Sequence, residues 1–161
     1  MNIQNFFVKS LDQSALVDCI SDRLNAPPDP PGLQPDWGLH SSYDIWLAED
    51  AKRKIAISPV TSGWIVGVES KQVVDFKLLQ TIAENLRAEV IACQVHMPLN
   101  YFGYARCVAG KIAESQCREG EDDPLRKVHS YLCRLGAPSE LFTFPEAIRL
   151  RSAGWRVLKR G

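Results

Sequence analysis

Residues 89–118 read EVIACQVHMPLNYFGYARCVAGKIAESQCR, and this stretch decides the fold class. It opens with a nearly continuous apolar run over 89–97, which is typical of a strand in the middle of a sheet. Pro98 ends that run, because proline donates no backbone hydrogen bond. The segments YFGYARCV and KIAESQCR then flank Ala109 and Gly110, a two-residue turn that indicates a β-hairpin. A hairpin beside a central strand predicts a sheet with antiparallel pairs.

Further strand patterns lie outside this stretch. Residues 2–9 are rich in β-forming side chains, and apolar residues alternate with others in 43–48, 54–58 and 64–69. The breaks between the last three runs, EDAKR and PVTSG, are turn sequences, so we expect these runs to be antiparallel neighbours. The basic tail WRVLKRG at 155–161 is interpreted as a last strand or an ordered cap.

Two helices are predicted before the decisive stretch. Ser10 and Gln13 have the spacing of a capping box, and apolar residues at helical spacing follow them, which predicts a helix over 11–24. Asp75 can cap a second helix over 76–87 that has one apolar face.

Two more helices are predicted after the hairpin. Asp123 and Pro124 are a typical N-cap and first-turn pair, and Gly136 ends the apolar periodicity that follows them. A final helix is expected from Pro145 to Gly154. The order β-α-β-β-β-α-β-β-β-α-α predicts one α+β domain over 1–161, with a mostly antiparallel sheet and the helices packed on one face. A strand, a helix and a strand group occur twice in that order, which suggests a βαβ-type pseudo-repeat.

The composition is that of an ordinary folded protein. Apolar residues make up 45% and charged residues 24% of the 161 residues, close to the usual globular values. The 19 basic and 19 acidic side chains balance, which removes the general positive field of most nucleic-acid binders. No apolar run approaches the ~20 residues that cross a bilayer, and no signal-peptide pattern opens the chain. We therefore expect a cytoplasmic protein without a membrane partner and with nucleic acid disfavoured as a partner.

Residues 25–42 form a proline-rich segment, NAPPDPPGLQPDWGLHSS, which predicts a long loop. Trp37 lies within it, and this side chain either folds back onto the core or belongs to a binding loop. Tyr101, Phe102 and Tyr104 form an aromatic cluster beside the hairpin. Clustered aromatic side chains often mark binding surfaces, although packing of one or two of them into the core is the alternative.

The five cysteines are widely spread and include no CxxC pair, so we expect them to be small apolar core residues. They are Cys19, Cys93, Cys107, Cys117 and Cys133.

Neither a metal site nor a catalytic centre is indicated by the spacing of the reactive side chains. His129 and Cys133 share a helix face, but two ligands do not make a metal site. Cys93 and His96 are three apart on a strand and point to opposite faces. The sequence has no glycine-rich phosphate loop, no GxSxG and no HExxH. We therefore expect no metal, no cofactor and no catalytic residue.

The arrangement GWIVGVES, helix, EVIACQVH and FGYARCVAGKIAES resembles a pattern found in small uncharacterised bacterial proteins. Some relatives of that kind look like immunity or antitoxin proteins. The matching positions are Trp64, Gly67, Gly103, Tyr104 and Gly110, which are mainly structural residue types. The resemblance assigns no catalytic residue to this chain.

Three functional hypotheses follow. The favoured one is a non-enzymatic protein that recognises another macromolecule, in the first place a protein, through the proline-rich loop, the 98–104 segment or the sheet edge. Its candidate binding residues are Trp37, Tyr101, Phe102 and Tyr104. The alternative is a small hydrolase or transferase with an unrecognised site of Cys, His and Glu side chains. The third is a structural subunit that is stable only with its partner.

Overall fold

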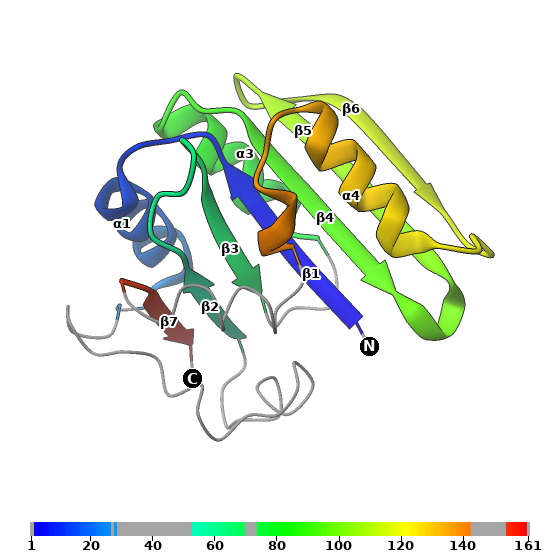
Figure 1. The fold of residues 1–161 in the computed structure, drawn as a ribbon. Helices are drawn as coiled ribbons and strands as arrows, with labels where there is room; N and C mark the ends of the chain where they lie inside the picture. The colour runs from blue at the N-terminus through cyan, green and yellow to red at the C-terminus, as the bar shows by residue number, and fades with distance from the viewer. Residues whose placement is uncertain (1, 27, 29–52, 70–73, 143–153, 161) are drawn as a thin grey trace.

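The computed structural model describes residues 2–26, 28, 53–69, 74–142 and 154–160 (Figure 1). The strands are β1 (Asn2–Val8), β2 (Arg53–Ile57), β3 (Ile65–Glu69), β4 (Val90–His96), β5 (Tyr101–Val108), β6 (Lys111–Arg118) and β7 (Arg156–Arg160). The helices are α1 (Gln13–Leu24), α3 (Phe76–Asn85) and α4 (Pro124–Arg134), with short 3-10 turns at Met97–Leu99 and Ser139–Leu141.

The described strands form one sheet in the order β6-β5-β4-β1-β3-β2-β7. Every neighbouring pair is antiparallel, with β1 in the centre between β3 and β4. The predicted α+β class with an antiparallel sheet is therefore confirmed. The decisive hairpin is also confirmed: Ala109 and Gly110 both have positive φ, as the tight turn between β5 and β6 requires.

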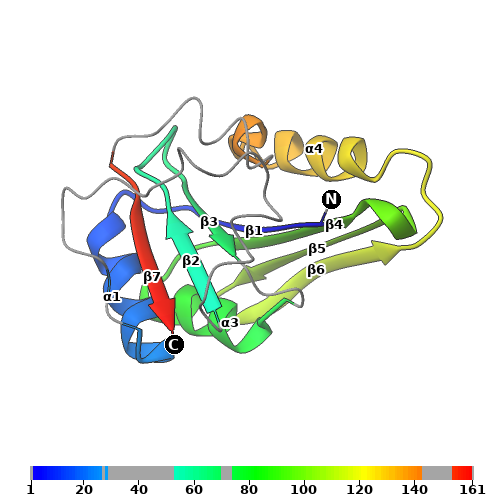
Figure 2. The same cartoon turned by 90° about the horizontal axis from the view of Figure 1, so that it is seen from below.

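The helices cover both faces of the sheet, so the prediction that they share one face is wrong. Figure 2 shows α4 on one side of the sheet and α1 and α3 on the other. The central strands are apolar on both sides: Phe7 of β1 belongs to the core under α4, and Phe6 belongs to the core under α1 and α3. A strand that is apolar on both faces needs cover on both, and one helical layer cannot provide it.

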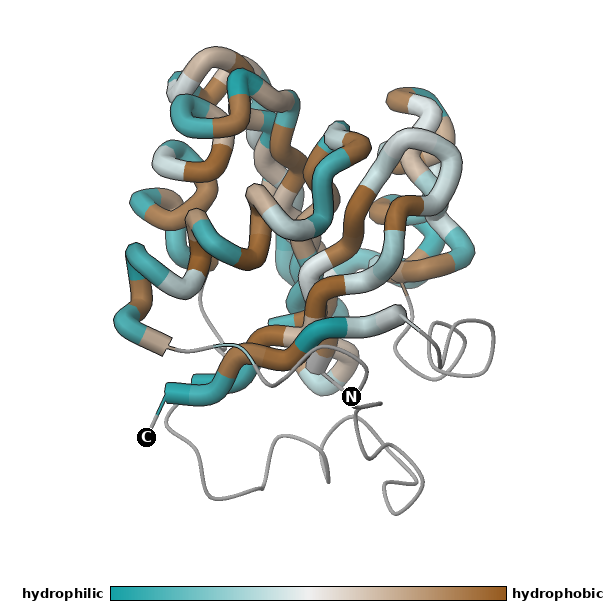
Figure 3. Tube along the Cα trace, turned by 90° about the vertical axis from the view of Figure 1, so that its left-hand side faces the viewer, coloured by the Kyte–Doolittle hydropathy of each residue, from teal (hydrophilic) through white to brown (hydrophobic). Residues whose placement is uncertain are grey.

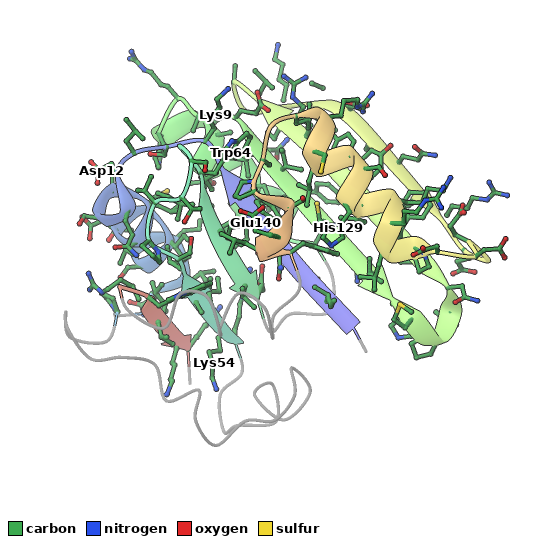
Figure 4. The ribbon with its side chains drawn as sticks, viewed as in Figure 1. Lys9, Asp12, Lys54, Trp64, His129 and Glu140 are labelled. Carbon is green, nitrogen blue, oxygen red and sulfur yellow. The ribbon has the colours of Figure 1, made fainter. Side chains whose placement is uncertain are left out.

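Helix α1 begins later than its predicted capping box. Asp12 is the N-cap, and its side chain accepts a hydrogen bond from the backbone N–H of Ala15 at 2.9 Å (Figure 4). Ser10 instead accepts a hydrogen bond from the N–H of Asp12. The Gln13 side chain donates to the carbonyl oxygen of Ser58 at 2.9 Å, which ties the start of the helix to the end of β2. Tertiary contacts therefore outweighed the local capping pattern.

The sheet is closely packed where β1 and β3 meet. A Cβ atom placed on Gly67 would lie 2.0 Å from the Phe6 ring, so only glycine fits this position of β3. Trp64 is buried just before β3, and the Lys9 ammonium lies 5.7 Å from its ring centroid (Figure 4). Hydrophobic and hydrophilic positions alternate along much of the trace, as amphipathic elements around a shared core require (Figure 3).

Several predictions fall on residues that the structure does not describe. These are the strand at 43–48, most of the loop at 25–42 including Trp37, and residues 145–153 of the helix predicted to end at Gly154. The pseudo-repeat and the single-domain boundary at 1–161 stay predictions. The tail is described as β7, so its interpretation as a last strand is confirmed. Within the described ranges, no helix has the length and apolar character that a membrane span requires.

Candidate functional site

A groove of about 350 Å³ lies on the sheet face that carries α3, between the start of that helix and strands β4, β5 and β6. We call it the α3 groove. The described residues that line it are Val74, Phe76, Ala92, Gln94, Tyr101, Gly103, Tyr104, Ala105, Ser115, Gln116 and Cys117. These residues include no Asp, Glu, Lys, Arg or His. The groove therefore presents apolar surface together with uncharged hydrogen-bonding groups.

Small residues keep the floor of the α3 groove low. Ala92 of β4, Gly103 of β5 and Ala105 of β5 present little or no side chain there. A Cβ atom on Gly103 would lie 2.7 Å from the Tyr101 hydroxyl oxygen, so the missing side chain lets the Tyr101 ring lie across β5. Bulky side chains at these positions would fill the space that a ligand could occupy.

Polar groups cross the floor of the groove in register. Gln94 of β4 is opposite Gly103 of β5, which is opposite Cys117 of β6. The Tyr101 hydroxyl approaches Cys117 across Gly103, and burial together with the thiol and Glu119 raises the pKa of Tyr101. The phenol is therefore protonated at neutral pH and can donate a hydrogen bond.

The start of α3, which forms one wall of the groove, is held by an ion-pair cluster. Asp75 is the N-cap of the helix, and its side chain accepts from the backbone N–H of Leu78 at 3.1 Å. Arg53 of β2 donates to Asp75 at 2.9 Å and also pairs with Glu69 of β3. Arg53 and Glu69 are only 8% and 2% exposed, so the pair is shielded from water. Charge pairing in a shielded position fixes the helix start relative to the sheet.

The opposite face of β5 is covered by α4, which also reaches Glu114 of β6. Tyr104 of β5 stacks on Tyr131 of α4 with ring centroids 3.6 Å apart and planes 11° apart. Glu114 of β6 accepts hydrogen bonds from the Tyr131 hydroxyl at 3.3 Å and from Arg134 at 2.8 Å. Arg134 also lies 5.1 Å from the Tyr131 ring centroid. The Tyr104 hydroxyl donates to Gln116 at 2.5 Å, which completes a cluster joining helix and hairpin.

The predicted aromatic cluster is divided between the two faces. Tyr101 is half-buried and lines the α3 groove, whereas the Tyr104 ring lies on the opposite face in its stack on Tyr131, although Tyr104 also borders the groove. Phe102 is 1% exposed and packs in the core beneath α4, so its side chain is not available to a partner on the surface. Trp37 lies outside the described residues. Neighbouring strand residues point to opposite faces, which separates Tyr101 from Phe102, whereas Phe102 and Tyr104 share the α4 face with ring centroids 6.0 Å apart.

The prediction that the cysteines are core residues holds for three of the five. Cys19, Cys93 and Cys107 are buried, whereas Cys117 and Cys133 are exposed. Cys117 is exposed because β6 is an edge strand, and the Cys133 thiol lies 3.2 Å from the Ser139 hydroxyl at the end of α4.

His129 does not join Cys133 in a site: its ring lies edge-on to Phe142, with centroids 5.8 Å apart. In the part of the chain that the structure describes, no group of three or more His, Cys, Asp and Glu side chains is placed to hold a metal ion.

Comparison of the chain with models of protein families, with characterised proteins and with solved structures found no match. The resemblance to immunity and antitoxin proteins therefore stays a prediction.

Sequence reasoning identified Tyr101 and Tyr104 but missed the other groove residues, among them Phe76, Gln94, Ser115 and Cys117. Phe76 is 46% exposed in the structure, but its spacing from Leu79 and Ala83 continues the apolar face of α3, so the sequence alone does not indicate that it is exposed. The other three are brought together only by the pairing of β4, β5 and β6. The spacing of these residues along the chain does not indicate which strands pair.

Proposed function

We propose that this protein is a non-enzymatic, cytoplasmic binding protein that holds a segment of another protein in the α3 groove. Immunity to a toxin, by covering the toxin's working surface, is one version of this function. One observation carries the proposal: two aromatic side chains, Phe76 at 46% exposure and the half-buried Tyr101, line the same groove. Aromatic side chains that are only partly covered are the usual anchors of protein interfaces.

The chemistry of the groove supports a protein partner over an anionic one. Its described lining has no positive side chain, and the chain as a whole has no net charge. Nucleic-acid sites depend on Lys and Arg at the phosphates. Gln94, Ser115 and the Tyr101 hydroxyl can instead pair with the amide groups of a peptide, while Val74 and Phe76 contact an apolar side chain.

The size of the groove supports a modest ligand. About 350 Å³ lies at the low end of the roughly 300–1,000 Å³ of small-molecule sites. One or two side chains of a partner fit such a space.

Photo-cross-linking from inside the groove tests the proposal. A photoreactive phenylalanine analogue replaces Phe76 in one variant and Leu11 in the control variant. Leu11 is also apolar and is 81% exposed, but it precedes α1 and does not line the groove. After irradiation in cells, we expect position 76 to give discrete adducts with a partner protein that position 11 does not give.

A second substitution then shows whether the groove itself is responsible. Cys117→Trp adds a large side chain to the floor, so the adducts from position 76 should disappear while circular dichroism remains native. Identical adducts from positions 76 and 11, or adducts that persist in Cys117→Trp, would show that the groove does not bind the partner.

A further inference from the structure

We propose that two copies of this chain join through β6, which pairs antiparallel with β6 of a second copy about a two-fold axis at Gln116. The two sheets then become one continuous sheet. This inference goes beyond the proposed function and does not depend on it, because the edge can pair whether or not a ligand lies in the groove.

The first observation is the character of β6. It is the outermost strand of the sheet beside β5 (Figure 1), and within the described elements β5 is its sole strand partner. It is eight residues long, and all of its residues except Glu114 are exposed. A long, exposed edge presents a row of backbone N–H and C=O groups that can pair with another strand.

The other edge is protected in ways that β6 is not. Strand β7 has five residues, two of which are buried, and Pro28 forms an isolated bridge to Leu158 on it. In β6 the register shift lies near the turn, beside Arg106 and Cys107, and Glu114 to Arg118 pairs regularly with β5. The regular half of β6 is therefore the part that a second copy can meet.

The charges on this half select one register. Residues directly opposite in an antiparallel pair point to the same face of the sheet. A two-fold axis between the strands must therefore lie midway between one residue and the same residue of the second copy. An axis at Glu114 sets that carboxylate against its own copy, and an axis at Ser115 or Cys117 pairs no opposite charges within 114–118. An axis at Gln116 places Glu114 opposite the second copy's Arg118, and this happens twice.

Of the two side chains, Arg118 is available, whereas Glu114 already accepts from Arg134 at 2.8 Å and would share its carboxylate with the second copy's Arg118. Arg118 is 68% exposed, and its contact with Glu121 is long, at 3.9 Å. Glu114 is 37% exposed. It lies on the same face of the sheet as Arg118, because the two residues are four positions apart in the part of β6 that pairs regularly with β5. Arg118 can therefore turn to the carboxylate of the second copy without breaking a close ion pair.

Pairing at Gln116 also affects the α3 groove. Ser115 and Cys117 line the groove and lie at its open side on β6. In the dimer, Ser115 of each copy is opposite Cys117 of the other, so the two groove floors become continuous across the axis. A partner segment could then contact both copies.

Disulfide trapping tests both the dimer and its register. All variants carry Cys133→Ser to remove the other exposed thiol. In Ser115→Cys the new thiol is directly opposite Cys117 of the second copy, at the separation of about 4.5–5.5 Å between Cα atoms that disulfides accept. We expect mild oxidation to give a covalent dimer on a non-reducing gel.

Two matched controls fix the register. Ser115→Cys combined with Cys117→Ser should give no covalent dimer, because residue 115 then faces serine. Gln116→Cys combined with Cys117→Ser should give one, because residue 116 faces its own copy. Cross-linking of the first control as strongly as Ser115→Cys would overturn the proposed register.

The dimer itself is checked without any cysteine change. Arg118→Glu should leave the fold intact, because this side chain is exposed, and should weaken dimerisation several-fold in sedimentation equilibrium. A wild-type chain that sediments as a monomer at every concentration, together with no trapped dimer from Ser115→Cys, would overturn the proposal. Neither result bears on cross-linking from position 76 to a different protein, so the two proposals fail separately.

Discussion

The two faces of the β5–β6 hairpin differ although the same two strands make both. On one face, Tyr104 and Glu114 are joined to Tyr131 and Arg134 of α4 by stacking, hydrogen bonds and an ion pair. On the other face, Gly103, Ala105, Ser115 and Cys117 leave the α3 groove open. The difference shows how alternate positions of one hairpin can serve stability and recognition separately, since strand neighbours point to opposite faces.

The largest expected effect comes from truncating neighbouring aromatic residues on the two faces. Phe102→Ala removes a ring that is 1% exposed from the core under α4, and we expect a loss of about 3–5 kcal/mol in the free energy of unfolding. Tyr101→Ala removes a half-buried ring from the groove and should cost about 1 kcal/mol. Urea denaturation measures both. Equal losses would contradict the distinction between a closed and an open face.

Thiol reactivity should separate the two faces by a large factor. Cys93 is fully buried under α4, and burial raises the pKa of its thiol, whereas Cys117 is exposed in the groove. Alkylation of Cys93 requires unfolding, so it should be slower than that of Cys117 by about a thousandfold or more. Peptide mapping by mass spectrometry after timed iodoacetamide treatment gives both rates. Comparable rates in the folded protein would show that the α4 face opens readily.

Adding one methyl group at two glycines sharpens the same comparison. Gly67→Ala drives a Cβ atom into the Phe6 ring in the closed core, and we expect a loss of about 1–3 kcal/mol. Gly103→Ala meets the Tyr101 hydroxyl, which is the free end of a side chain beside open space, so its cost should be below about 1 kcal/mol. Thermal unfolding of the two variants checks which substitution costs more. A larger loss for Gly103→Ala than for Gly67→Ala would mean that the Tyr101 side chain is rigidly held.

The smallest expected effect is the pH dependence of the α4 face. The hydrogen bond from Arg134 holds the pKa of Glu114 below its usual value. A lowered folded pKa stabilises the protein above the unfolded pKa, and this contribution is lost as the pH falls through the folded pKa. Glu114→Gln should therefore lower the Tm by at most a few degrees near neutral pH, and by less at about pH 2. An equal change at both pH values would mean that the ionised carboxylate has no role.

Most secondary structure followed from local pattern. The helix predicted over 76–87 is observed as α3 at Phe76–Asn85, and the apolar run at 89–97 is observed as β4. Asp75 and Asp123 act as the predicted N-caps. Ser10 does not act as an N-cap. Asp12 caps the helix instead, and with this start the Gln13 side chain reaches the end of β2. Local patterns failed where a long-range contact competed with them.

The candidate site was only partly predictable. Tyr101 was named from its aromatic neighbours, but Phe102 in the same cluster belongs to the core. Gln94 and Cys117 are separated by 22 intervening positions in the chain and meet only because β4, β5 and β6 pair in one register. Residue type indicates that an aromatic or polar group can bind, whereas its face of the sheet decides whether it is accessible.

The amino-acid sequence by itself determined that this chain forms an antiparallel sheet with amphipathic helices, because periodicity and turn residues act over a few positions. Only the tertiary structure decided that α4 covers one face while the other stays open over β5 and β6. The physical reason is that strand order and helix placement depend on contacts between distant segments, in which each apolar face must find cover somewhere in the whole chain. The α3 groove and the edge of β6 are two surfaces that the described elements leave uncovered.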